Sequence, residues 1–115
     1  MGAWGNQPWD NDRAADWFGD LFERTQLAPI VEKTLLLDPA DFPDEIRAAA
    51  CALVFWGRVY VWPVKELQRH LALAADQLEA VSRLEEITES LKLAKQIQSE
   101  VQELRSRLAQ YERRP

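Results

Sequence analysis

The sequence is poor in the residues that carry most small-protein chemistry. It has one cysteine, one histidine and four glycines in 115 residues. A single cysteine, Cys51, forms no intrachain disulfide, and together with His70 it supplies too few ligands for a Cys/His zinc site. None of the glycines belongs to a phosphate-binding fingerprint. We therefore expect no catalytic residue, no metal ligand and no cofactor.

Long hydrophobic runs are also missing. The longest, "AAACALVFWG", is about half of what a membrane span requires. The start of the chain, Met1 to Asp10, has no basic region followed by an apolar run, so a signal peptide is not expected. These features predict a soluble cytoplasmic protein that does not bind a membrane.

Positive charge is scarce in the first half of the chain. Residues 1–50 hold ten acidic and four basic side chains, whereas residues 51–115 hold nine acidic and ten basic ones, which gives the net charge of −5. Proteins that bind nucleic acid need a basic surface, so we expect no nucleic-acid partner. The acidic half favours a basic protein partner or a cation, with simple solubilising charge as the alternative.

Apolar residues recur mostly at steps of three and four, and no strand pattern or internal repeat is present. The sequence predicts an all-α fold in which residues 1–115 form one domain. An ordered Trp-rich arm, residues 1–11, precedes a bundle of four to five helices, residues 12–115.

The first two helices are predicted from short apolar stripes. Asp10 or Asn11 caps the first helix, whose stripe consists of Ala14, Trp17, Phe18, Leu21 and Phe22. The second has Pro29 near its start and presents Ile30, Val31, Thr34 and Leu35.

A third helix is predicted between a cap at Asp41, with Asp44 completing a capping box, and a stop at Gly57. Its core face consists of Ile46, Ala49, Ala50, Leu53 and Val54. The small residues of "AAACA" let another helix approach closely, so we expect this to be the central helix and Cys51 to be buried. The following Arg58–Trp62 stretch has no strand partner and is interpreted as an extended connection.

The remaining chain predicts two long helices. One starts at Pro63, with His70 beside an apolar stripe of Leu67, Leu71, Ala74, Ala75, Leu78 and Val81. After a break near Thr88–Ser90, where Ser90 caps a new helix, a heptad seam follows: Ile97, Val101, Leu104, Leu108 and Tyr111. We expect this seam to pack on the central helix of its own chain or on a partner.

The candidate binding residues are carboxylates of the first helix: Asp12, Asp16, Asp20 and Glu23. At spacings of four, four and three they share a face about 80° wide, opposite the Trp17–Leu21 stripe. This face is interpreted as a solvated surface, as a docking surface for a basic partner, or as part of a divalent-metal site.

The segments "MGAWG" and "DNDRAADW" resemble the signature of a bacterial family known as domain of unknown function 4259. The matching residues are Trp4, Gly5, Trp9, Asp10, Asn11, Asp12, Ala14, Asp16 and Trp17. The later "AAACALV" and "LRSRL" segments are similar to that family's later blocks. The resemblance implies a bacterial origin and brings no activity with it. We expect the three signature tryptophans to fix the arm and the first helix to the core.

Three functions remain open at the level of the sequence. The leading one is a small acidic protein-interaction module, an immunity-type or regulatory binder of one cognate protein. The second is a hydrolase-like enzyme that uses Asp10, Asp12 and Asp16 around a divalent metal. The third is a homo-oligomer assembled through the last helix, since the oligomeric state does not follow from the sequence.

Overall fold

Six helices make up most of the chain that the computed structural model describes, residues 5–113, and there is no strand among those residues. They are α1 (Asp12–Thr25), α2 (Leu27–Leu35), α3 (Pro43–Trp56), α4 (Val64–Ser82), α5 (Glu85–Thr88) and α6 (Leu91–Glu112). The predicted all-α class is confirmed. The structure has six helices in its described residues where four to five were expected, and the four-residue α5 is the shortest of them.

Helix ends follow local signals at three of the predicted positions. The Asn11 side chain caps α1 by accepting the Ala14 N–H at 2.9 Å, and Ser90 caps α6 by accepting the Leu93 N–H at 3.3 Å. Gly57 ends α3 as predicted. The expected cap at Asp41 is wrong: Phe42 precedes α3, and Pro43 starts it with a backbone angle already suited to a helix.

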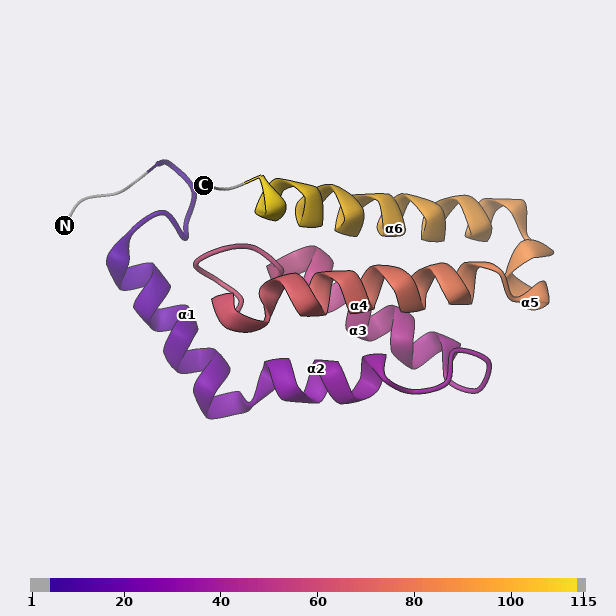
Figure 1. Cartoon of the computed structure of the whole chain (residues 1–115), viewed down its shortest axis with the longest axis horizontal. Coiled ribbons are helices and arrows are strands. Elements are labelled where there is room, and N and C mark those ends of the chain that lie inside the picture. The colour runs from indigo at the N-terminus through magenta and orange to yellow at the C-terminus, as the bar shows by residue number, and fades with distance from the viewer. Residues whose placement is uncertain (1–4, 114–115) are drawn as a thin grey trace.

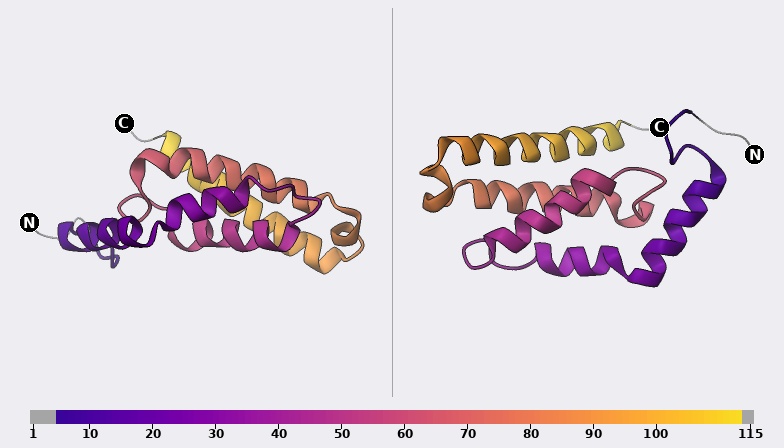
Figure 2. Two further views of the ribbon diagram at one scale, coloured as in Figure 1. Left: turned by 90° about the horizontal axis from the view of Figure 1, so that it is seen from below. Right: turned by 180° about the vertical axis from the view of Figure 1, so that it is seen from behind.

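The centre of the molecule is α4, not the predicted α3. Helix α4 packs against α2, α3, α5 and α6, with its largest contact on α6. Figure 1 shows α6 lying beside α4 along its length, joined to it through α5. Both views in Figure 2 place α1 at one end of the molecule, where it packs on α2 and touches α3 only through the edge-on contact of Phe22 with Trp56 among the described residues. The long helix pair gives the molecule its elongated dimensions of 52 × 26 × 22 Å.

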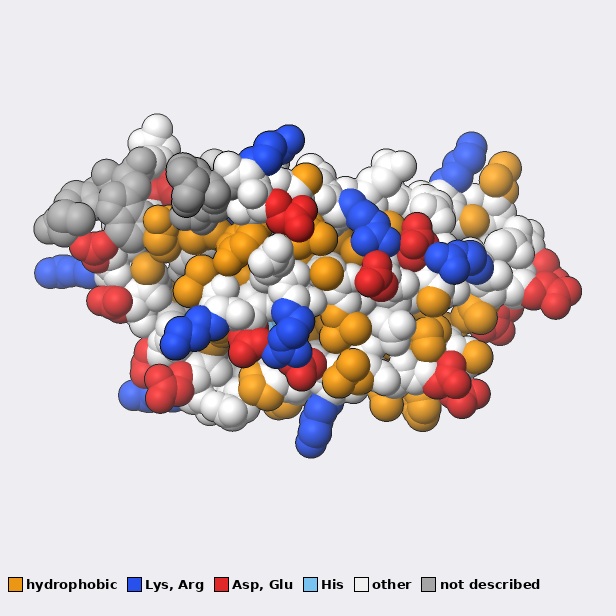
Figure 3. All heavy atoms as spheres, in the orientation of Figure 1, with side chains coloured by type: hydrophobic (Ala, Val, Ile, Leu, Met, Phe, Trp, Pro, Cys, Tyr) orange, Lys and Arg blue, Asp and Glu red, His pale blue; other side chains and the backbone are white. Residues whose placement is uncertain are grey.

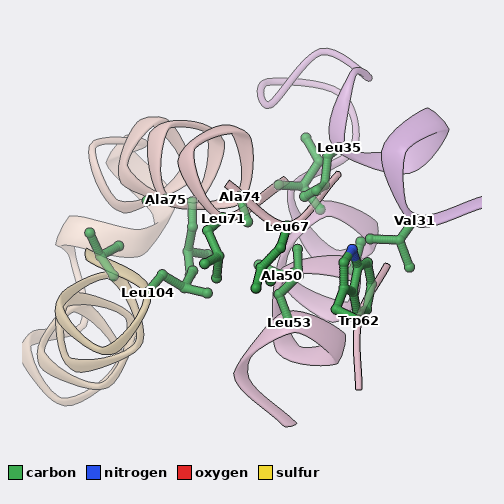
Figure 4. Close-up of a cluster of buried hydrophobic side chains, with 14 of the residues drawn as sticks. Val31, Leu35, Ala50, Leu53, Trp62, Leu67, Leu71, Ala74, Ala75 and Leu104 are labelled. Atoms are coloured by element: carbon green, nitrogen blue, oxygen red, sulfur yellow. The ribbon is translucent and has the colours of Figure 1, made fainter. Parts of the chain in front are cut away.

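The core lies on both sides of α4. Leu67 and Leu71 of α4 lie near Leu53 of α3 and toward Leu104 of α6 (Figure 4). The predicted core face of α4 is confirmed in full, and that of α3 is confirmed for the four residues other than Val54, which is half-buried. The seam of α6 is buried at its first three positions and only partly buried at Leu108 and Tyr111.

Three apolar residues expected inside lie outside. Cys51 is exposed because it lies on the side of α3 opposite the buried stripe that begins with Ile46. Ile30 of α2 is also exposed, since α2 buries Ala28, Val31 and Leu35 instead. Trp17 is 61% exposed, because few neighbours cover α1.

The connection between α3 and α4 is a tight turn rather than an extended segment. The Arg58 carbonyl accepts the N–H groups of Val61 and Trp62 at 3.2 and 3.0 Å. Tyr60 has a left-handed φ of 73°. A side chain at Gly57 would collide with the Leu53 carbonyl oxygen, so this position requires glycine. The turn buries Val61 and Trp62 between α1 and α4, a contact that an extended chain would not make.

The described part of the arm is held by Trp9 and Asp10. Trp9 is partly buried against the core, and the Arg58 guanidinium carbon lies 4.3 Å from the centre of its ring. The Asp10 carboxylate accepts the Gln7 N–H at 3.0 Å, and a side chain at Gly5 would collide with that carboxylate. Trp4 lies outside the described residues.

No helix within residues 5–113 is both long enough and apolar enough to cross a membrane.

Candidate functional site

The predicted acidic face of α1 is mostly at the surface. Asp16, Asp20 and Glu23 are exposed, while Asp12 is half-buried. Acidic side chains are visible along the outer edge of α1, at the left of Figure 3. Asp20 forms an ion pair with Arg24 at 3.1 Å, and among the described residues it is the member of this face that has an ion pair.

Trp17 lies beside this acidic face, which corrects its predicted position on the buried stripe. With about 100° between successive helix residues, Trp17 is about 60° from Asp20 around the axis. Its ring rests edge-on against Phe18, with ring centres 5.2 Å apart, and most of its surface is open to solvent. An exposed tryptophan therefore adjoins the exposed carboxylates.

The aspartates of the metal hypothesis are not brought together. Asp10 accepts a backbone N–H of its own turn, and Asp12 follows the Asn11 cap in the first turn of α1. Within residues 5–113, only one group of three His, Cys, Asp or Glu side chains places its ligand atoms within 4.8 Å of one another, and it contains neither aspartate.

That group surrounds the buried His70, which the sequence predicted only to lie beside an apolar stripe, and its two carboxylates are half-buried. His70 is 1% exposed, yet both ring nitrogens are in contact with polar groups. Trp62 donates its indole N–H to His70 Nδ1 at 3.0 Å, and His70 Nε2 lies 2.7 Å from Glu32 Oε1. Glu66 Oε2 is 3.9 Å from Nε2, and Arg69 contacts both carboxylates. The cluster joins α2, α4 and the 57–63 turn.

The hydrogen bonds fix the position of the proton on His70. An indole N–H is only a donor, so Nδ1 accepts and carries no proton. Nε2 then carries the proton and donates it to Glu32. Because both nitrogens are engaged, the ring offers no free lone pair to a substrate as a general base.

Arg69 balances the two carboxylates of the cluster. Its Nη1 lies 2.6 Å from Glu32 Oε1, and its Nη2 pairs with Glu66. The hydrogen bond from His70 lowers the pKa of Glu32, burial opposes that shift, and Arg69 adds to it. Glu66 and Glu32 in turn raise the pKa of Arg69.

The donor set of Glu32, Glu66 and His70 fits a metal ion poorly. To ligate through Nε2, His70 would have to move its proton to Nδ1, where it would face the Trp62 N–H. A cation would also have to displace the Arg69 guanidinium. The arrangement therefore favours a partly exposed ion-pair network that connects α2 to α4 over a metal centre.

Two cavities meet near this network. One, of about 550 Å³, is lined by the charged side chains of the cluster together with Lys33 and the first turn of α2. The other, of about 590 Å³, lies between α1 and the 57–63 turn and is mainly apolar. Both are lined by Gln26, Ala28, Pro29 and Glu66. Such sizes are typical of small-molecule sites, but the polar groups at their shared border are already paired.

Sequence reasoning could have found part of the His70 cluster. Glu66 and His70 stand four residues apart, which places them on one face of a helix. Glu32 is 38 residues from His70 in the sequence, and only the fold brings the two together.

Comparisons with protein-family models, with curated proteins and with solved structures give no match to this chain. The resemblance of the amino-terminal segments to domain of unknown function 4259 therefore stays a prediction.

Proposed function

We propose that the protein is a binding module for one basic protein and that α1 is its docking surface. The observation that carries the proposal is the exposure of Trp17 next to Asp16 and Asp20. A tryptophan is costly to leave in water, and tryptophans are enriched among the residues that dominate binding energy at protein interfaces. The exposed carboxylates select a partner of opposite charge.

The contacts of α1 support this role. It packs on α2 and touches α3 through Phe22 and Trp56, so most of its outer surface is available. The helix is nevertheless capped at Asn11 and fixed to the core by Phe22, which is 3% exposed. A preformed surface loses little conformational freedom on binding. Its acidic charge would steer a basic partner toward it and make the association rate depend on salt.

The chemistry of the surface limits what binds there. Trp17 offers a flat apolar face, and a Lys or Arg side chain can lie on such a ring while it pairs with a neighbouring carboxylate. The expected partner therefore presents basic residues around an apolar or guanidinium anchor. Membership of the 4259 family would be compatible with this proposal but assigns it no partner.

The test compares proteins captured from the source cells by four tagged forms of the chain. These are the wild type, Trp17→Ala, the pair Asp16→Asn/Asp20→Asn, and the control pair Glu86→Gln/Glu89→Gln. The control removes the same charge from exposed positions of α5 and the residue after it. We expect one basic protein to bind the wild type and the control and to be lost from both α1 variants.

The affinity and the association rate of the purified partner are then measured with each of the four forms. Truncating a central interface tryptophan should weaken affinity by about 2 kcal/mol or more, a thirtyfold change. The aspartate pair should reduce the association rate and flatten its salt dependence. A captured protein that binds all four forms equally would reject α1 as the docking surface.

A further inference from the structure

A pocket beside the 57–63 turn carries excess positive charge in an otherwise acidic protein. Arg58 of the turn and Arg107 of α6 both line this cavity, which has a volume of about 270 Å³. The other lining residues are Gly57, Val59, Leu67, Leu71, Gln110 and Tyr111. Among the described residues, no carboxylate lines the pocket.

Arg58 forms no ion pair with any described residue. Its guanidinium lies over the Trp9 ring, and its Nε is buried with no hydrogen-bond partner in the described part of the chain. Buried donors are nearly always satisfied in folded proteins, and an unsatisfied one frequently marks a place for an ion or a ligand. The Arg58 side chain is thus held in place without a counter-ion.

Arg107 increases the imbalance. It donates from Nη1 to the Leu53 carbonyl oxygen at 2.8 Å and from Nε to Glu103 at 3.1 Å. Among the described residues, the carboxylate whose charge raises the pKa of Arg58 is that of Glu103, so two guanidinium groups share this negative charge. Burial lowers the pKa of Arg58, the charge of Arg107 lowers it further, and Glu103 opposes both.

We propose that this pocket binds a small organic carboxylate with an apolar body. The planar fork of a guanidinium matches a carboxylate, which accepts two parallel hydrogen bonds from it. The net charge of +1 from Arg58, Arg107 and Glu103 suits a monoanion. Leu67, Leu71 and Val59 provide an apolar floor, and Gln110 and Tyr111 add polar groups that can orient the ligand. This inference uses no residue of α1 and does not depend on the proposed partner.

Calorimetric titration of the full chain tests the proposal with three probes of the same shape. Benzoate carries the carboxylate, benzyl alcohol is uncharged and benzylamine is positive. We expect benzoate to bind at least tenfold more tightly than either of the others, since a charge-assisted pair contributes a factor of ten or more. Higher salt should weaken benzoate binding only.

Substitutions of Arg58 test whether benzoate binds at this residue. Arg58→Gln should reduce benzoate affinity at least tenfold, and Arg58→Lys should retain part of it because it keeps the charge but loses the fork. The control is Arg83→Gln, because Arg83 follows the last residue of α4 whereas Arg58 lies before its first residue. Thermal melts establish that each variant is folded.

Two outcomes would overturn the proposal. One is benzoate that binds no more tightly than benzyl alcohol. The other is benzoate affinity that is unchanged in folded Arg58→Gln, because the pocket would then not be where the anion binds.

Discussion

Helices α1 and α6 are both amphipathic helices with half or more of their residues at the surface, but their apolar residues are used differently. Helix α6 buries Ile97, Val101 and Leu104 and lies along α4. Helix α1 fully buries only Phe22 and leaves Trp17 in water.

Their ion pairs differ in the same way. Glu100 of α6 reaches Arg47 of α3 at 2.8 Å, and Arg105 of α6 reaches Asp76 and Glu79 of α4 at 3.0 Å each. The ion pair of α1, Asp20 with Arg24, stays within the helix. Helix α6 is thus joined to the rest of the fold by both its apolar and its charged residues. Helix α1 instead leaves apolar Trp17 and most of its charged residues exposed on its surface. The docking role proposed for α1 requires this second arrangement.

The largest expected effect is at the centre of the α6 seam. Leu104 is fully buried, so Leu104→Asp loses its packing and buries a charge without a partner. We expect a loss of about 4 kcal/mol or more in the free energy of unfolding, measured by urea denaturation. The control is Leu91→Asp on the same helix, where the side chain is 69% exposed and the change should stay within about 0.5 kcal/mol.

Equal effects of these two substitutions would mean that α6 is not held by its seam. Helices α1 and α6 would then not differ in how their apolar residues hold them to the fold.

A second effect concerns the turn on which α1 rests. The Phe22 ring packs edge-on against Trp62 with ring centres 5.1 Å apart, and Trp62 donates to His70. Trp62→Phe removes that donor and should cost about 1–3 kcal/mol, because Nδ1 of His70 is left buried and unpaired. Hydrogen exchange should speed up in α1 and α2 more than in α6.

Trp56→Phe serves as the matched control, since Trp56 also packs against Phe22 but is exposed and has no described hydrogen bond from its indole. If the two variants lose the same stability, the Trp62–His70 hydrogen bond has no net effect.

The long helices could be predicted from the sequence because each repeats one apolar stripe over several turns. All six predicted core positions of α4 are buried, since α4 has neighbours on most sides. Cys51 was wrongly expected to be buried because its neighbours in the sequence are small. Its place in the 3.6-residue repeat puts it on the side of α3 opposite Ile46. The error at Trp17 is of another kind. The stripe of α1 is broad, and only the fold shows that few neighbours cover it.

The candidate sites were predictable to different extents. The exposed acidic face follows from spacing within one helix, which the sequence contains. The His70 cluster and the Arg58–Arg107 pocket each join residues that lie far apart in the chain. Arg58 gave no signal, because the turn that presents it depends on the left-handed Tyr60 and on the close approach at Gly57.

A third effect is the pH dependence of the ion pair between Glu100 of α6 and Arg47 of α3. Hydrogen bonds from Arg47 lower the pKa of Glu100, with burial opposing and Gln96 assisting. A folded-state pKa below the unfolded value of 4.5 stabilises the protein above that pH, and the stabilisation is lost as pH falls through the lowered folded-state value. Glu100→Gln should therefore cost about 1 kcal/mol at pH 7 and progressively less in acid.

Unfolding curves at pH 7 and pH 3 measure this change, with the exposed Glu86→Gln as control. A cost for Glu100→Gln that stays constant between the two pH values would contradict the assigned ion pair.

A fourth effect is a gain of stability in α1. Gly19 lies in the middle of the helix, and an added Cβ would meet nothing within 4 Å. Gly19→Ala should stabilise the protein by about 0.5–1 kcal/mol by restricting the unfolded chain. A loss of stability in thermal melts would mean that α1 packs more tightly than the structure shows.

The smallest effect is a difference in stability between two substitutions on the acidic face of α1. Asp16 stands four residues from both Asp12 and Asp20, and like charges at that spacing each cost about 0.2–0.5 kcal/mol. Asp16→Asn should therefore raise stability by about 0.5 kcal/mol in low salt, and less in 0.5 M salt because of screening. Asp20→Asn relieves one repulsion but breaks the pair with Arg24, so its net effect should be near zero. Chemical denaturation of both variants at the two salt concentrations measures the difference. If Asp16→Asn stabilises the protein and also lowers its affinity for the partner, the repulsion at Asp16 reduces stability while its charge contributes to binding. If Asp16→Asn instead destabilises the protein, Asp16 has a structural role, and the acidic face would reduce to Asp20 and Glu23.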